Sequence, residues 1–207
     1  MSRKKISVTG ITGGIGSGKS RAAAFLCSRY PVCCLSADAC VHDLLEPGQA
    51  GWEAVQKLDP IYVRDDQTIN KPLLRTHLFS DAALRQEIND ALHPLVQKQI
   101  VAEVERETKK GHLAFLVEVP LLFEARWQSL FHDIIVVYAS REKCIQRITY
   151  RDNVSSDDAE RALASQMPLA EKVELAGHVI NNSGIWLDTV LQLIHLGNLL
   201  WLQSAKK

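Results

Sequence analysis

Apolar positions fall into five short runs along the chain, and longer stretches of mixed polarity separate them. The first run alternates apolar with small residues, and the later runs are almost continuously apolar, as in strands buried on both faces of a sheet. The runs are residues 6–12, 32–35, 113–117, 134–138 and 178–180. Short apolar strands alternating with helices predict an α/β fold, with a five-stranded parallel sheet flanked by helices.

The stretch between the second and third runs is too long for a simple crossover. Its spacing is mostly helical and more polar, which predicts a helical insertion over residues 40–111. Asp81 is a candidate N-cap for a helix that runs to His93, and Pro94 should end or kink that helix. A second charged helix is predicted over residues 97–110, closed by Gly111.

A glycine-rich segment joins the first predicted strand to the first predicted helix. Residues 13–20 read Gly-Gly-Ile-Gly-Ser-Gly-Lys-Ser, and we call them the phosphate loop. Glycines let backbone N–H groups converge on an anion, Lys19 can reach the β- and γ-phosphates, and the Ser20 hydroxyl can ligate Mg²⁺. The strand–loop–helix context predicts binding of ATP with Mg²⁺. The residues expected at the nucleotide are Gly14, Ile15, Gly16, Ser17, Gly18, Lys19 and Ser20.

Polar residues follow several of the other strands, where parallel sheets gather their ligands. Asp38 could take a proton from an acceptor hydroxyl or could cap a helix over residues 39–45. Glu118 could hold Mg²⁺ through water or could bond nearby backbone N–H groups. Asn181 and Asn182 could read an adenine edge or cap the following turn.

Two arginines lie on one face of a predicted helix after the fourth strand. Arg147 and Arg151 are four residues apart, so their side chains project from the same face. They could neutralise charge that develops during phosphoryl transfer. The alternative is a solvated face that pairs with nearby aspartates, namely Asp152, Asp157 or Asp158.

Composition limits the partners of the chain. Twenty-four basic residues balance twenty-four acidic ones among 207 residues, so no overall field recruits nucleic acid. Without a signal sequence or an apolar span of membrane length, the expected location is the cytoplasm. Five cysteines without Cys-x-x-Cys spacing argue against a disulfide framework or a zinc site. Cys33 and Cys34 are expected to be buried free thiols in a strand.

Several segments, in order along nearly the whole chain, resemble the dephospho-coenzyme A kinase family. The most specific are Leu-His-Pro at residues 92–94 and Pro-Leu-Leu-Phe-Glu at residues 120–124. The others are the phosphate loop, Ala37-Asp38, residues 78–81, Arg147, Tyr150-Arg151-Asp152, Ser165-Gln166 and Ile180-Asn181-Asn182.

The resemblance implies ATP-dependent phosphorylation of the ribose 3′-hydroxyl of dephospho-coenzyme A. It implies a nucleotide-binding core over residues 1–39, 112–145 and 176–207, an acceptor-binding insertion over 40–111 and a helical lid over 146–175. Asp38 would be the base, with Lys19 and Arg147 as the other catalytic residues. ATP would be contacted by Arg21, Arg151 and Asn182, and the metal would be held by Ser20 and Glu118. The residues implied at the acceptor are Asp38, Lys71, His93, Leu122 and Glu124.

Three positions depart from the usual pattern of that family. Ser36 stands in place of an aspartate, Arg21 in place of a threonine, and Lys71 in place of an arginine. Lysine keeps the charge but loses bidentate geometry toward phosphate. Two other functions stay open: a different small-molecule or nucleoside monophosphate kinase, and a nucleotide-dependent switch. The lack of an Asn-Lys-x-Asp motif disfavours a GTPase. The expected state is a monomer or weak homo-oligomer.

Overall fold

A computed structural model describes residues 6–202, without the side chain of Phe79. Five parallel strands form one sheet in the order β2-β3-β1-β4-β5. The strands are β1 (Ser7–Gly13), β2 (Cys33–Ser36), β3 (Ala114–Glu118), β4 (Asp133–Tyr138) and β5 (His178–Asn181). Their bounds match the five apolar runs within one or two residues, and the predicted parallel sheet is confirmed.

The helices follow the predicted alternation. They are α1 (Lys19–Arg29), α2 (Ala37–Leu44), α3 (Ala50–Leu58), α4 (Lys71–Ser80), α5 (Ala82–Lys109), α6 (Arg141–Asp152), α7 (Ser156–Ala164), α8 (Leu169–Glu174) and α9 (Trp186–Gly197). Short 3-10 turns cover Pro60–Tyr62 and Gln128–Leu130, and a π-helical turn covers Asn198–Leu202.

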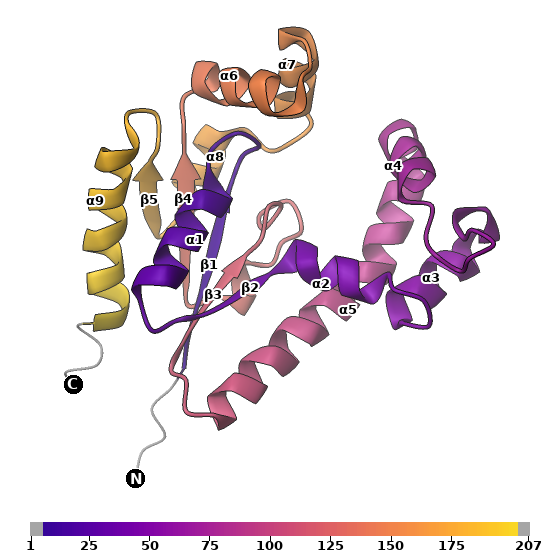
Figure 1. Cartoon of the computed structure of the whole chain (residues 1–207), viewed down its shortest axis with the longest axis horizontal. Coiled ribbons are helices and arrows are strands. Elements are labelled where there is room, and N and C mark those ends of the chain that lie inside the picture. The colour runs from indigo at the N-terminus through magenta and orange to yellow at the C-terminus, as the bar shows by residue number, and fades with distance from the viewer. Residues whose placement is uncertain (1–5, 203–207) are drawn as a thin grey trace. The chain divides into compact units, whose positions relative to one another are not determined.

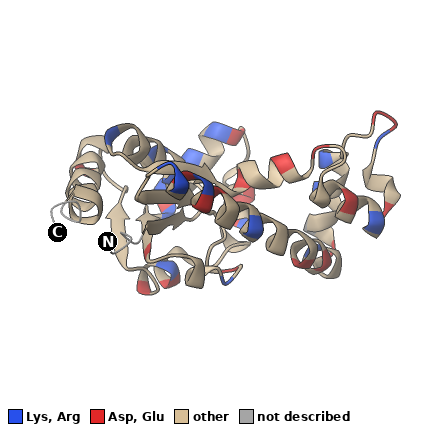
Figure 2. Cartoon of the chain, turned by 90° about the horizontal axis from the view of Figure 1, so that it is seen from below, with Lys and Arg blue, Asp and Glu red and all other residues tan. Residues whose placement is uncertain are grey.

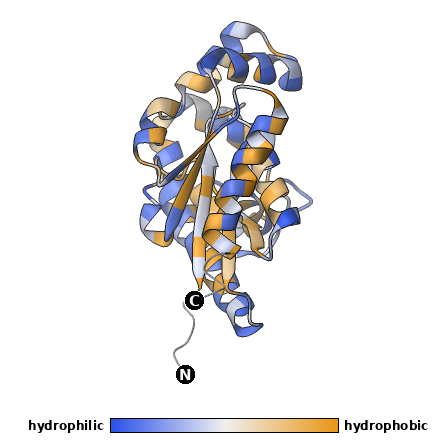
Figure 3. Cartoon of the chain, turned by 90° about the vertical axis from the view of Figure 1, so that its left-hand side faces the viewer, coloured by the Kyte–Doolittle hydropathy of each residue, from blue (hydrophilic) through white to orange (hydrophobic). Residues whose placement is uncertain are grey.

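The chain forms two compact units. The first comprises the described residues up to Ser36 and from Glu107 onward, and the second runs from Ala37 to Arg106. In the first unit, α1 and α9 pack on one face of the sheet, where Leu26, Leu193 and Trp201 are buried together with strand residues (Figure 1). In Figure 3 the α6 and α7 helices are mostly hydrophilic, whereas the strands carry apolar positions interspersed with paler and more polar ones. The second unit has its own core around Trp52, Val55 and Ile88.

The helix predicted to end or kink at Pro94 does not end there but continues as α5 to Lys109. Asp81 caps α5 as expected, because its carboxylate accepts the N–H groups of Ala83 and Leu84 at 2.9 and 3.0 Å. Proline costs an internal helix one hydrogen bond. Burial of neighbouring apolar residues, with Leu92, Val96 and Ile100 all under a tenth exposed, outweighs that loss. The prediction of two helices was therefore wrong.

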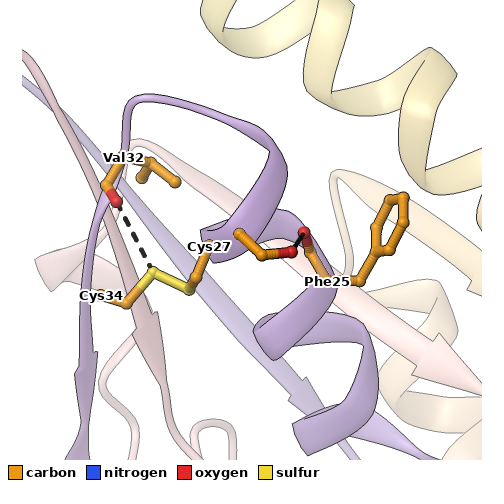
Figure 4. Close-up of a disulfide and its surroundings, with 5 residues drawn as sticks. Phe25, Cys27, Val32 and Cys34 are labelled. Atoms are coloured by element: carbon orange, nitrogen blue, oxygen red, sulfur yellow. Dashed lines mark hydrogen bonds between the residues drawn. A yellow bond between two sulfur atoms is a disulfide. The ribbon is translucent and has the colours of Figure 1, made fainter.

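A disulfide joins the end of α1 to β2. Cys27 and Cys34 are bonded, with their Cα atoms 6.1 Å apart, and the Cys34 sulfur lies 3.7 Å from the Val32 carbonyl oxygen (Figure 4). The expectation that Cys34 is a buried free thiol was wrong. Because β2 is an edge strand, its side chains are only partly covered, and the turn after α1 brings the two cysteines into bonding range.

Charge is distributed without a dominant sign. Lys and Arg residues are interspersed with Asp and Glu along the described chain (Figure 2), as expected from the balanced total. None of the helices between residues 6 and 202 combines the length and the apolar character that crossing a membrane requires.

Candidate active site

The phosphate loop lies between the carboxyl end of β1 and the first turn of α1. Gly16 and Gly18 have φ angles of +76° and +90°, which only glycine adopts without strain. A Cβ on Gly16 would come within 2.7 Å of the Cys144 carbonyl oxygen, and one on Gly18 would collide with the Asn182 amide. The loop is therefore shaped by both backbone conformation and close packing, and it aims the positive end of α1 at its concavity.

Side chains from distant segments hold the outside of the loop. The Arg147 guanidinium on α6 donates to the carbonyls of Gly16 and Ser17 at 3.1 and 3.2 Å, and to the Asn182 carbonyl at 2.8 Å. The Gln166 side-chain oxygen accepts the Ile15 N–H at 2.9 Å. The Gly16 and Ser17 carbonyls are thus turned toward Arg147, the Ile15 N–H is bonded to Gln166, and the Ser17 N–H is bonded to the Gly14 carbonyl within the loop.

Asn182 is a buried support of the phosphate loop. Its side-chain amide donates to the Ser17 carbonyl at 2.8 Å, and its side-chain oxygen accepts the Thr189 hydroxyl at 2.9 Å. An adenine edge would have to compete with both bonds, so the structure gives this side chain a positioning role. Asn181 and Asn182 were expected either to read an adenine edge or to cap the following turn. Asn181 fits the cap, because its carboxamide oxygen accepts the Ser183 N–H.

Replacing Asn182 with alanine should lower the free energy of unfolding by about 2 kcal/mol, because two buried hydrogen bonds lose a partner. The Michaelis constant for ATP should rise at the same time, since the loop loses its inner support. Urea denaturation and initial-rate kinetics measure the two effects. Asn181→Ala, at an exposed neighbour, is the matched control and should cost less than about 1 kcal/mol. Equal losses in the two variants would contradict the support role.

Lys19, Ser20 and Glu118 meet at the mouth of the phosphate loop. The Lys19 ammonium lies 2.9 Å from Glu118 Oε1, and the Ser20 hydroxyl donates to the same oxygen at 2.6 Å. Parallel pairing of β1 with β3 places Glu118 at the carboxyl end of the sheet, opposite Ile11. A hydroxyl and a carboxylate are the hard oxygen ligands that Mg²⁺ accepts, so these residues fit the ion.

Glu124, predicted to bind the acceptor, forms an ion pair with Lys172 in the structure, and its role toward the acceptor stays a prediction. The Lys172 ammonium lies 2.7 Å from Glu124 Oε1, which also accepts the Met167 N–H at 3.1 Å. Lys172 has no exposed surface, whereas Glu124 is 24% exposed. The pair therefore ties the segment after β3 to α8 and gives the buried Lys172 side chain a carboxylate partner.

Replacing Glu124 with glutamine should lower the free energy of unfolding by about 3–5 kcal/mol, since the buried Lys172 ammonium loses its counter-charge. The double variant Glu124→Gln with Lys172→Met should recover part of this loss. Chemical denaturation measures both. Glu160→Gln breaks an exposed pair with Arg141 and should cost less than about 1 kcal/mol. A loss for Glu124→Gln no larger than for this control would show that the pair contributes little.

Three predicted acceptor residues belong to the second unit. Asp38 is exposed in the first turn of α2, which begins at Ala37, so it is not the residue that precedes the helix. Lys71 is exposed at the start of α4. His93 is half-buried within α5, and burial lowers the pKa of its imidazole, with Asp90 acting in the opposite direction. Their roles toward the acceptor remain predictions.

Three further predicted contacts find other partners in the structure. Leu122 has no exposed surface and packs beside Gly10, and its predicted contact with the acceptor stays a prediction. The Arg21 guanidinium stacks 3.8 Å from the centre of the Trp186 ring. Arg151 pairs with Asp152 through two 2.7 Å bonds, which matches the alternative of a paired surface arginine.

A pocket of about 570 Å³ opens beside the phosphate loop. Gly14, Ala139 and Cys144 line one side, and Gln166–Ala170 line the other. Burial raises the pKa of the Cys144 thiol, and Arg141 also lines the pocket. The segment that lines the second side falls within the predicted lid, so lid residues and the phosphate loop share one cavity inside the first unit.

The sequence gives little sign of two supporting residues. Lys172 looks like any surface lysine next to Glu171, and its burial depends on the segment after β3. Thr189 lies on the buried side of α9, and its hydroxyl donates to Asn182. The sequence pattern does not distinguish such a threonine from any small residue of the core. Gln166 belongs to a segment that carries the family resemblance, so the sequence marks it as a candidate. Its spacing from other residues does not indicate its role.

Comparisons with known proteins identify the family of the chain. The family model described as dephospho-CoA kinase matches residues 7–188. A dephospho-CoA kinase from Halalkalibacterium halodurans is 33% identical over 188 residues, 90% of this chain and 93% of that protein.

Two solved structures resemble the chain. The crystal structure of TT1252 from Thermus thermophilus is 29% identical, with a TM-score of 0.81 over 93% of this chain and 96% of that one. The dephospho-CoA kinase from Campylobacter jejuni is 24% identical, with a TM-score of 0.67 over 91% and 94% of the two chains, which supports the P-loop kinase fold. With the phosphate loop, the sheet and the family match in agreement, the chain belongs to the dephospho-CoA kinase family.

Proposed function

We propose that this chain transfers the γ-phosphoryl group of ATP to the ribose 3′-hydroxyl of dephospho-coenzyme A, giving coenzyme A and ADP. The observation that carries the proposal is the convergence of Lys19, Ser20 and Glu118 at the mouth of the phosphate loop. The match to the dephospho-CoA kinase family supports dephospho-coenzyme A as the acceptor. Together they support ATP chemistry at one edge of the sheet and a coenzyme A precursor as its second substrate.

The residues of the first unit bind and orient the triphosphate. Backbone N–H groups of the loop and the N-terminus of α1 receive the phosphate oxygens, and Lys19 neutralises charge on the β- and γ-phosphates. Arg147 lies against the loop through the Gly16 and Ser17 carbonyls, and we assign its charge to the stabilisation of the transferred group. Catalysis of this kind depends on fixed positions and fixed charges.

Ser20 and Glu118 are the residues that would hold Mg²⁺. When bound, the ion would neutralise negative charge on the triphosphate. Glu118 Oε1 is shared by Lys19 and Ser20. The same carboxylate therefore keeps the lysine and the hydroxyl in place before the nucleotide arrives.

Asp38 is the base that we assign to the acceptor hydroxyl. A carboxylate beside that hydroxyl orients it and accepts its proton as the new oxygen–phosphorus bond forms. Lys71 and His93, from the same unit, are proposed to contact the acceptor. The lid, residues 146–175, would exclude water from the cavity that Gln166–Ala170 line, so that ATP is not hydrolysed.

A panel of acceptors tests the substrate assignment. ADP release is followed with ATP and Mg²⁺, with dephospho-coenzyme A, with each nucleoside monophosphate, and with no acceptor. We expect turnover with dephospho-coenzyme A alone. Phosphorylation of nucleoside monophosphates without that of dephospho-coenzyme A would instead assign the chain to nucleotide metabolism, and slow hydrolysis that no acceptor changes would indicate a switch.

A further inference from the structure

Three side chains with metal-binding atoms converge at the end of the sheet opposite the phosphate loop. Cys33 is the first residue of β2, His112 lies two residues before β3, and Glu107 is in the last turn of α5. Cys33 Sγ lies 2.7 Å from His112 Nδ1 and 3.8 Å from Glu107 Oε2, and the last two atoms are 2.9 Å apart. Among the described residues, this is the one group of three or more such side chains.

The donor set favours a particular class of ion. A thiolate and an imidazole are the ligands that Zn²⁺ and Co²⁺ prefer, and a carboxylate oxygen completes three of the four positions of a tetrahedral site. Mg²⁺, which takes hard oxygen ligands, does not suit a thiolate. The group is therefore chemically distinct from the site formed by Ser20 and Glu118.

The surroundings suit a tetrahedral site with three protein ligands and one position open to water. The Lys110 ammonium holds Glu107 Oε1 at 2.5 Å, which leaves Oε2 directed toward the cysteine and the histidine. The His112 side chain is 51% exposed, whereas that of Glu107 is 11% exposed. Tetrahedral bonds of about 2.0–2.3 Å set ligand atoms roughly 3.3–3.6 Å apart. His112 has room to move outward by the several tenths of an ångström that this requires.

We propose that Cys33, Glu107 and His112 form a site for a zinc-class divalent cation, with water in the fourth position. Binding forms three metal–ligand bonds and releases the Cys33 thiol proton to solvent, without any change of oxidation state. The ion would connect the last turn of α5, the loop before β3 and the first residue of β2. Sequence spacing argued against a zinc site because the three ligands come from two separate segments, without the paired cysteines of the common motifs.

Cobalt(II) titration of the full-length protein tests the proposal. We expect one equivalent to bind, with the near-ultraviolet charge-transfer absorption of a Co²⁺–thiolate bond, and Zn²⁺ to displace it. Cys33→Ser should abolish that absorption. Glu107→Gln and His112→Ala should each lower the affinity for Co²⁺ at least 10–100-fold. That is the usual cost of losing a residue that only hydrogen-bonds a metal ligand, and these two residues bind the metal directly.

Three matched controls separate this site from other thiols and histidines. Cys40→Ser should leave the titration unchanged, because burial, with Asp43 and Glu103 nearby, raises the pKa of that thiol to about 11. His195→Ala removes an exposed histidine outside the proposed site and should also leave the titration unchanged. The double variant Cys27→Ser with Cys34→Ser removes the disulfide and should keep the absorption.

Thermal unfolding gives a second readout, independent of kinase activity. At free Zn²⁺ one hundred times the Kd, the melting temperature of the wild type should rise by about 5–10 °C, and that of Cys33→Ser should not change. A wild-type protein without the charge-transfer absorption at millimolar Co²⁺ would overturn the proposal. So would an absorption of equal strength in Cys33→Ser.

Discussion

Replacing Lys19 with alanine should lower kcat/KM for ATP by about 10³-fold, the range expected when a group that neutralises phosphoryl charge is lost. Two effects contribute. The triphosphate loses a positive charge, and Glu118 loses the ammonium that lies 2.9 Å from its carboxylate. An uncompensated carboxylate at the mouth of the phosphate loop repels the nucleotide, so both the rate and ATP binding should suffer. Steady-state ADP release and ATP titration calorimetry measure the two losses.

Two companion variants make the Lys19 result specific. Lys109→Ala removes an exposed lysine at the end of α5 and should leave kcat/KM within about twofold of the wild type. Adding Glu118→Gln to Lys19→Ala should restore part of the ATP affinity measured without Mg²⁺, because the repelling charge is removed and no metal ligand is needed under that condition. A double variant that binds ATP no better than Lys19→Ala would contradict the charge argument.

Replacing Asp38 with asparagine should lower kcat by 10²–10⁴-fold, the usual contribution of a positioned general base, and should leave ATP affinity almost unchanged. Asparagine keeps the size of the side chain but cannot accept the proton of the acceptor hydroxyl. Because Asp38 is exposed in the first turn of α2, the substitution should also spare stability. Quenched-flow kinetics and ATP calorimetry separate the two quantities.

The comparison with Asp43→Asn, an exposed aspartate further along the same helix, controls for a general loss of charge on α2. That variant should keep wild-type turnover. If Asp38→Asn lost ATP affinity to the same extent as Lys19→Ala, the assignment of Asp38 to the acceptor would be wrong.

The strands and the phosphate loop could be predicted because their signals are local. Apolar runs mark β3 and β4, and glycines at Gly16 and Gly18 are required by their positive φ angles. The pairing of Glu118 with Lys19 could be expected in part, since parallel strands place their carboxyl ends at one edge. That the same oxygen also accepts the Ser20 hydroxyl depends on atomic positions that no pattern specifies.

The failures share a physical cause, which is that long-range packing overrides local preference. Pro94 should interrupt a helix, yet α5 continues because its apolar face is buried. Leu122 and Glu124 lie in a family segment that suggested substrate contacts; the first is buried in the core and the second pairs with Lys172, and their roles toward the acceptor stay predictions. A buried lysine has no sequence signature, because its burial depends on a segment about fifty residues away.

The fate of the γ-phosphoryl group is the most direct test of phosphoryl transfer between the phosphate loop and the acceptor hydroxyl. The enzyme, Mg²⁺ and γ-³²P-labelled ATP are mixed with dephospho-coenzyme A and quenched, and labelled coenzyme A and inorganic phosphate are separated and counted. We expect one labelled coenzyme A for each ADP formed, with little free phosphate. Label that appears as inorganic phosphate at the same rate with and without dephospho-coenzyme A would contradict the proposed transfer.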